Sequence, residues 1–103
     1  MNMVSKALAE MGGAFALIFV GAGSIMLSEK HIVPAFCIPL AWGLMVSLMI
    51  IAVGHISGAH FNPAVTLAFA ITKRIPFSEI WFYWTSQMIG GIIAASLLGA
   101  LNK

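Results

Sequence analysis

The stretch GHISGAHFNPAVTLAFA, residues 54–70, interrupts an apolar chain with glycines and histidines and then resumes at Asn62. Asparagine is among the best helix caps, and Pro63 suits the first helical position because its missing N–H would be unpaired there. A helix from Pro63 to Thr72 would be roughly 15 Å long, about half the hydrocarbon core of a bilayer. The stretch therefore predicts a half-length helix that enters a membrane and stops.

The composition is typical of a membrane protein. Hydrophobic residues make up 61% of the 103 positions and charged residues 8%, which leaves too few polar groups to cover a soluble domain of this size. The net charge of +2 is small and scattered, so it does not favour nucleic acid as a partner. Cys37 is the one cysteine, which excludes a disulfide framework within the chain. The expected partner is membrane lipid.

Three long apolar segments frame the half-helix, and each is long enough to cross a bilayer. The first carries one charge, that of Glu10, and the second carries none. The expected fold class is an all-α membrane protein with three transmembrane helices and one re-entrant half-helix. The spans are expected at residues 7–27, 34–54 and 80–101, and the re-entrant loop and half-helix at 55–72, all in a single domain, 1–103.

The distribution of Lys and Arg favours a cytoplasmic N-terminus. In that orientation more basic residues lie inside than outside; the inner ones are Lys6, Lys73 and Arg74, and the outer ones Lys30 and Lys103. Aromatic side chains gather at the inner end of the third span, where such rings favour the headgroup region. They are interpreted as lipid anchors and are Trp81, Phe82, Tyr83 and Trp84. The expected location is the cell membrane, crossed several times.

The loop before Asn62 implies a cavity, because non-helical backbone at membrane depth is tolerated only where it is buried in protein or lines water. The carbonyls of Gly58, Ala59 and His60 are candidates to line this cavity. The side-chain oxygen of Asn62 would accept bonds from the first helical turn, which leaves its amide hydrogens as outward donors. A row of acceptors beside one fixed donor suits a small neutral solute that forms hydrogen bonds.

SGAHFNPAVT, residues 57–66, resembles the hallmark of the aquaporin, or major intrinsic protein, family. The chain is most similar to the nodulin-like intrinsic proteins of plants and their bacterial relatives. The likeness covers the first half of the family's sequence, including Ala9-Glu10 in the first span and Ser86-Gln87 with Gly90 in the third. Full-length members have six spans and two such loops, related as inverted repeats. The resemblance implies a second half, either a C-terminal repeat or an inverted copy, and a homotetramer when complete.

The resemblance also assigns roles to individual residues. It implies a pore motif of Asn62, Pro63 and Ala64, a carbonyl ladder of Gly58, Ala59 and His60, a selectivity filter that includes Trp42, and a loop supported by Glu10 and Gln87. Tryptophan at the filter position is common in glycerol-conducting and nodulin-like members. This favours a solute broader than water, such as glycerol, urea or a metalloid hydroxide.

Some of these side chains have a second interpretation. A carboxylate inside a span can relay protons, so Glu10 has a proton-relay interpretation beside the structural one. A metal or haem pair is the alternative interpretation of His55 and His60. It is disfavoured because the two lie a few residues apart across glycines, with no other histidine inside the membrane. No metal or other cofactor is expected. No catalytic residue is expected either, because no nucleophile has a base beside it and no carboxylates are paired.

Two functions remain open. The chain is either a channel half that conducts water and small neutral solutes once paired, while excluding ions and protons, or a non-conducting truncated fragment that only assembles with full-length channels. The presence of Asn62, the carbonyl loop, Trp42 and Glu10 favours a working half, or a piece cut from a longer channel, over a decayed remnant. Gly91, Ala95 and Gly99 recur at helical spacing, and this stripe of small residues predicts close helix packing within the monomer or between protomers.

Overall fold

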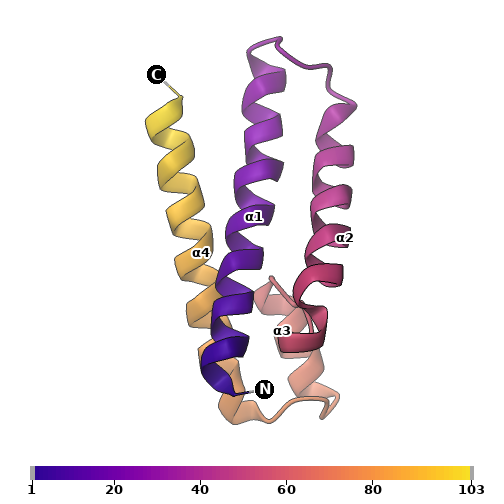
Figure 1. The fold of residues 1–103 in the computed structure, drawn as a ribbon, viewed down its shortest axis with the longest axis vertical. Coiled ribbons are helices and arrows are strands. Elements are labelled where there is room, and N and C mark those ends of the chain that lie inside the picture. The colour runs from indigo at the N-terminus through magenta and orange to yellow at the C-terminus, as the bar shows by residue number, and fades with distance from the viewer. Residues whose placement is uncertain (1, 103) are drawn as a thin grey trace.

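The computed structural model describes residues 2–102, which fold into helices and connecting turns (Figure 1). Three helices are long and apolar enough to cross a membrane, which confirms the all-α fold class with a shorter helix between the second and third spans. The elements are α1 (Met3–Glu29), α2 (Cys37–Ser57), α3 (Pro63–Ile71), the 3-10 turn η1 (Phe77–Glu79) and α4 (Ile80–Leu101).

The helix α1 stands between α2 and α4 (Figure 1). The N-terminus lies at the same end as the turn between α3 and α4, where Lys6 Nζ and Glu79 Oε1 form an ion pair 3.3 Å apart. The α1–α2 loop and the C-terminal end of α4 lie at the opposite end. This arrangement agrees with the order of spans in the sequence, but the side of the membrane stays a prediction. Lys103, expected outside, lies beyond the described residues.

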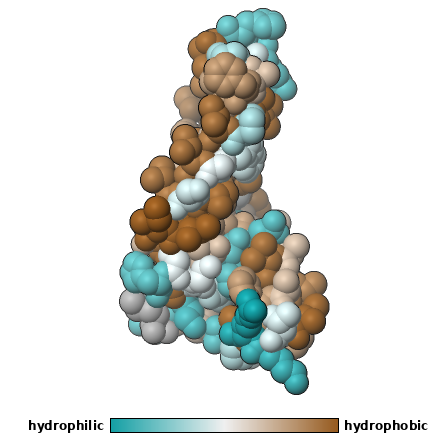
Figure 2. Space-filling view, turned by 90° about the vertical axis from the view of Figure 1, so that its right-hand side faces the viewer, coloured by the Kyte–Doolittle hydropathy of each residue, from teal (hydrophilic) through white to brown (hydrophobic). Residues whose placement is uncertain are grey.

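The core lies between α1 and α4. A Cβ atom on Gly90 of α4 would overlap the backbone carbonyl oxygen of Met11 in α1, so glycine permits the two helices to meet closely. By contrast, α2 buries only Ser57, and α3 buries only Thr66 and Ala70. Figure 2 looks onto the α2 side and shows hydrophobic residues over most of this face, with polar residues mainly at its two ends.

The predicted limits of the second span are wrong at both ends. The helix begins at Cys37 rather than Pro34, because the residues before it form a turn in which the Cys37 N–H donates to the Pro34 carbonyl at 3.0 Å. It continues past Gly54 to Ser57, where Gly58 ends it with a φ of 89°. This left-handed conformation suits glycine, which has no Cβ to clash. The re-entrant loop therefore begins at Gly58.

The limits of the other helices differ less from the prediction. The helix α1 covers Met3–Glu29 instead of 7–27, because the side chain of Asn2 caps it by accepting from the Ser5 N–H at 2.8 Å. The half-helix α3 begins after Asn62 as predicted and ends at Ile71. The helix α4 follows a 3-10 turn and has the predicted limits.

The interpretation of the aromatic cluster as lipid anchors is wrong for Tyr83, and Trp84 makes an additional contact within the protein. Tyr83 is only 2% exposed, and its hydroxyl donates to the carbonyl of Ser57. The indole N–H of Trp84 donates to the carbonyl of Pro63 at 3.1 Å. Both side chains pair a polar group with backbone, but only Tyr83 is buried, and Trp84 stays partly exposed. Trp81 and Phe82 are exposed on α4.

Candidate functional site

The site begins at the N-terminus of α3. Asn62 has the extended backbone of a helix cap, and its Oδ1 accepts from the Ala64 N–H at 2.8 Å. Pro63 occupies the first helical turn, where a missing N–H costs nothing. The side chain of Asn62 is exposed, and its amide nitrogen has no hydrogen-bond partner among residues 2–102. The N-terminal end of the half-helix therefore presents free donors.

The loop that leads to Asn62 has an unusual backbone. Gly58, Ala59 and Phe61 have φ values of 89°, 55° and 54°, all in the left-handed region. For a residue with a Cβ atom this conformation costs about 1–2 kcal/mol. A loop with two such residues needs contacts from elsewhere in the fold to hold its shape.

Glu10 of α1 supplies these contacts. Its side chain is fully buried, and both carboxylate oxygens accept two hydrogen bonds each. Oε2 accepts from the Ser57 hydroxyl at 2.7 Å and from the His60 N–H at 3.0 Å. Oε1 accepts from the Phe61 N–H and from Gln87 Nε2, both at 2.8 Å. No oxygen is left free to pick up a passing proton, so this geometry favours the structural interpretation of Glu10 over the relay.

His60 is fixed on several sides. Its ring stacks between those of Phe69 and Tyr83, with centroid distances of 4.6 and 4.5 Å. Its Nδ1 lies 2.9 Å from the hydroxyl of Thr66, which also accepts from Gln87 Nε2 at 2.9 Å. His60 is buried, whereas His55 is exposed on α2. No group of three or more His, Cys, Asp or Glu side chains suited to a metal occurs within the described part of the chain.

A cavity of about 380 Å³ lies beside the loop. It brings together Asn62, Trp42 and two of the ladder candidates, Ala59 and His60. Gly58, the third ladder candidate, is not among its lining residues, because it caps α2 instead. The remaining walls are apolar and come from Leu17, Ile18, Val46, Phe61 and Val65. The cavity thus has a polar side at the loop and an apolar side on α1 and α2.

The position of Trp42 depends on α1. A Cβ atom on Gly21 would overlap the indole ring of Trp42, so the ring lies directly against the backbone of α1.

Pro63 lines a neighbouring cavity of about 380 Å³, and Ala64 is exposed. The three residues of the predicted pore motif therefore lie together at the exposed start of α3.

Sequence reasoning missed Ser57, Thr66 and Tyr83 as parts of this hydrogen-bond network. Thr66 is fully buried, and a signal for it was available. It is a polar side chain in the otherwise apolar helix PAVTLAFAI, and such residues inside a membrane usually face the protein interior. The partners of Ser57 and Tyr83 lie far away in the sequence, so local pattern could not reveal them.

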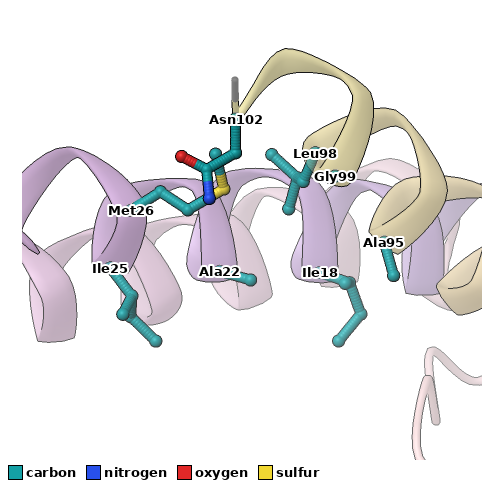
Figure 3. Close-up of a pocket in the computed structure, with 8 residues that line it drawn as sticks. All are labelled: Ile18, Ala22, Ile25, Met26, Ala95, Leu98, Gly99 and Asn102. Carbon is teal, nitrogen blue, oxygen red and sulfur yellow. The ribbon is translucent and has the colours of Figure 1, made fainter.

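Two cavities follow the seam between α1 and α4 from the loop toward the far end of the bundle, and they share Ile18 and Ala95. Figure 3 shows the far one, of about 340 Å³, where Ile18, Ala22 and Ile25 of α1 lie along one side and Ala95 and Gly99 of α4 along the other. We call the surface that lines both cavities the α1–α4 seam. Its residues are Ala14, Ile18, Ala22, Ile25, Met26, Phe61, Pro63, Gln87, Met88, Gly91, Ile92, Ala95, Leu98, Gly99 and Asn102.

Gln87 gives the seam a polar group. Its Nε2 donates to Glu10 and Thr66, which fixes the orientation of the amide. Its Oε1 is buried and has no hydrogen-bond partner within residues 2–102. A buried acceptor without a partner costs about 1–3 kcal/mol, so a donor supplied by another segment or by water would be favourable here.

The sequence of this chain is similar to those of known membrane proteins. The family model described as Major intrinsic protein matches residues 1–103. The chain is 44% identical over 102 residues to aquaporin NIP2-1 of Zea mays, covering 97% of this chain and 35% of that protein. It is 42% identical over 99 residues to aquaporin NIP3-1 of Arabidopsis thaliana, covering 94% and 31%. It is 40% identical over 100 residues to nodulin-26 of Glycine max, covering 95% and 37%.

The chain thus spans about a third of the length of these curated relatives. Its three long apolar helices and the family match make it a multi-pass membrane protein. The re-entrant helix capped by Asn62 and the loop held by Glu10 lie in the part of the sequence that the family model covers. The chain belongs to the major intrinsic protein family.

Proposed function

We propose that residues 1–103 form the first half of a membrane channel that conducts water and small neutral solutes and excludes ions and protons. The observation that carries this proposal is the free amide of Asn62 at the N-terminus of α3, beside a cavity that Trp42 also lines. A helix N-terminus carries about half a positive elementary charge. This charge disfavours cations, while the amide offers a hydrogen bond to a neutral solute.

The site residues then have distinct roles. Asn62, Pro63 and Ala64 form the pore constriction, the carbonyls of Ala59 and His60 offer acceptors, and Trp42 forms part of the selectivity filter. Glu10 supports the loop by accepting from its backbone amides. Gln87 supports it indirectly, through its bonds to Glu10 and to Thr66 of α3. A cavity with one polar side and one apolar side fits glycerol, urea or undissociated metalloid hydroxides, which combine hydrogen-bonding groups with low charge.

The proposal includes a second half that covers the exposed sides of α2 and α3 and the α1–α4 seam. Two observations support it: the Oε1 atom of Gln87 lacks a partner, and Gly91, Ala95 and Gly99 line the seam, where small residues favour close approach of another helix. The second half is a C-terminal repeat or an inverted copy of this chain. Complete channels would assemble as homotetramers.

Vesicle swelling tests the proposal. The chain is joined to the C-terminal half of aquaporin NIP2-1 of Zea mays, reconstituted into vesicles, and water, glycerol and proton fluxes are measured by stopped flow. We expect water and glycerol flux above that of empty vesicles, without proton leak. Folded protein that raises neither flux would contradict the proposal.

A matched pair of variants tests the role of Asn62. Asn62→Asp and Asn2→Asp each keep a side-chain oxygen as a helix cap, but only the first adds a negative charge beside the cavity. We expect Asn62→Asp to admit cations and Asn2→Asp to behave like the unmodified channel. Equal cation flux in the two variants would remove Asn62 from the pore.

A further inference from the structure

We propose that Trp84 is a positioning residue, whose indole N–H fixes the N-terminus of α3 and thereby the side chain of Asn62. The contact is the hydrogen bond from Trp84 Nε1 to the Pro63 carbonyl, 3.1 Å long. The consequence for transport rests on the proposed function, but the positioning itself does not. From sequence alone Trp84 is indistinguishable from the other aromatic residues of its cluster.

The half-helix α3 has few other attachments. It packs mainly against α4 and buries only Thr66 and Ala70. Side chains of α4 reach it by two hydrogen bonds: Gln87 bonds to Thr66 in the second turn, and Trp84 bonds to Pro63 in the first. Residues three apart lie on one face of a helix, so the two bonds join one face of α4 to one face of α3. The bonds of Glu10 to the loop end at Phe61, so the Trp84–Pro63 bond is the side-chain contact from α4 that holds the first turn itself. Without it, this turn could tilt between Phe61 and Thr66.

The chemistry of the contact makes it directional. An indole N–H is a donor only, and proline has a carbonyl but no N–H, so the bond can form in only one way. Pro63 directly follows Asn62, whose Oδ1 is tied to the Ala64 N–H at 2.8 Å. A displacement of the Pro63 peptide would therefore turn the Asn62 side chain and redirect its free amide hydrogens.

The neighbouring residue Trp81 provides a matched control. Its ring packs edge-to-face against that of Trp84, with centroids 5.5 Å apart. It is 68% exposed, and its indole nitrogen has no hydrogen-bond partner among the described residues. Trp81→Phe keeps an aromatic ring beside Trp84 and removes an N–H that positions nothing.

The decisive test is hydrogen exchange of the full chain in lipid nanodiscs. Trp84 is replaced by 3-benzothienylalanine, in which sulfur takes the place of the ring N–H and the shape is kept, and separately by phenylalanine. Loss of one neutral hydrogen bond should speed exchange of the Ala64 and Thr66 amides by about three- to tenfold, while Trp81→Phe leaves them unchanged. Unchanged exchange in the benzothienyl variant, or equal acceleration in Trp81→Phe, would overturn the proposal.

A second measurement distinguishes positioning from loss of folded protein. In the joined channel, the ratio of proton to water flux should rise in both Trp84 variants and stay constant in Trp81→Phe, whereas a smaller folded fraction would lower both fluxes together. A constant ratio despite faster exchange would refute the effect on Asn62. If the unmodified channel conducts nothing, the proposed function fails, and hydrogen exchange alone decides whether Trp84 positions α3.

Discussion

The pair α1–α4 and the pair α2–α3 differ in how completely they are packed. Along α1 and α4, buried residues recur on one face of each helix, and Gly90 lets the two backbones approach. Along α2 the side chains of Leu44 and Ile51 are 63% and 78% exposed, and the buried residues of α3 number only two, Thr66 and Ala70. The first pair is closely packed along one shared face, and the second pair is mostly surface.

This difference shows which groups need a partner. Exposed apolar side chains on α2 can face acyl chains without cost, because lipid is as apolar as leucine. The free amide of Asn62 and the buried Oε1 of Gln87 cannot, since unpaired polar groups at membrane depth cost several kcal/mol. At these two polar groups a hydrogen-bond partner from another segment or from water would therefore be favourable.

The largest effect on the free energy of unfolding is expected from Glu10→Leu in α1. This change leaves the donors of Ser57, His60, Phe61 and Gln87 without their acceptor, so the free energy of unfolding should fall by on the order of 4 kcal/mol or more. Glu10→Gln keeps one acceptor and should lose about 2 kcal/mol. Both values are measurable by unfolding in mixed micelles.

The control for this change is Glu29→Leu, at the exposed end of α1, which should alter the free energy of unfolding by less than about 0.5 kcal/mol. Equal losses from Glu10→Gln and Glu10→Leu would argue that the loop needs the negative charge and not merely an acceptor.

A smaller effect on the free energy of unfolding is expected where α1 and α4 touch. Gly90→Ala would place a Cβ atom against the backbone of Met11, and separation of the helices should cost about 1–3 kcal/mol. Gly12→Ala adds the same methyl group where no atom lies within 4 Å and should be neutral or stabilising by up to about 1 kcal/mol. Similar unfolding energies for the two variants would show that α1 and α4 are not closely packed.

The last prediction concerns the contact between α1 and α2, where Gly21 lies against Trp42. The expected effect here is mainly on selectivity and least on stability. Gly21→Ala should push the ring of Trp42 toward the cavity and lower the glycerol-to-water permeability ratio of the joined channel. Gly43→Ala meets no atom within 4 Å and should leave the ratio unchanged. An unchanged ratio in Gly21→Ala would remove Trp42 from the filter.

The sequence predicted those parts of the fold that depend on local chemistry. The start of α3 is confirmed, because the cap by Asn62 and the first-turn Pro63 involve only adjacent residues. The predicted end of α2 at Gly54 was wrong, because Gly54 and Gly58 are both residues that could end a helix, and the helix ends before Gly58. Contacts decide between them: Glu10 lies far away in the sequence, yet it bonds to Ser57 and the loop amides.

The candidate site shows the same limit. Asn62 and the loop carbonyls followed from the sequence pattern, whereas Glu10 and Gln87 entered through family resemblance. The positions of Tyr83 and Trp84 could not be predicted, because an amphipathic ring near a helix end suits either a headgroup region or a buried acceptor. The acceptors on Ser57 and Pro63 lie on other elements.

The most direct test of the central claim, that the surface around Asn62 is one half of a pore, is the flux through vesicles that contain this chain without any second half. We predict water flux equal to that of empty vesicles, and flux restored by joining the second half. Water flux through the joined channel no greater than that of empty vesicles, or flux through residues 1–103 alone that Asn62→Asp and Asn2→Asp both leave unchanged, would contradict this claim.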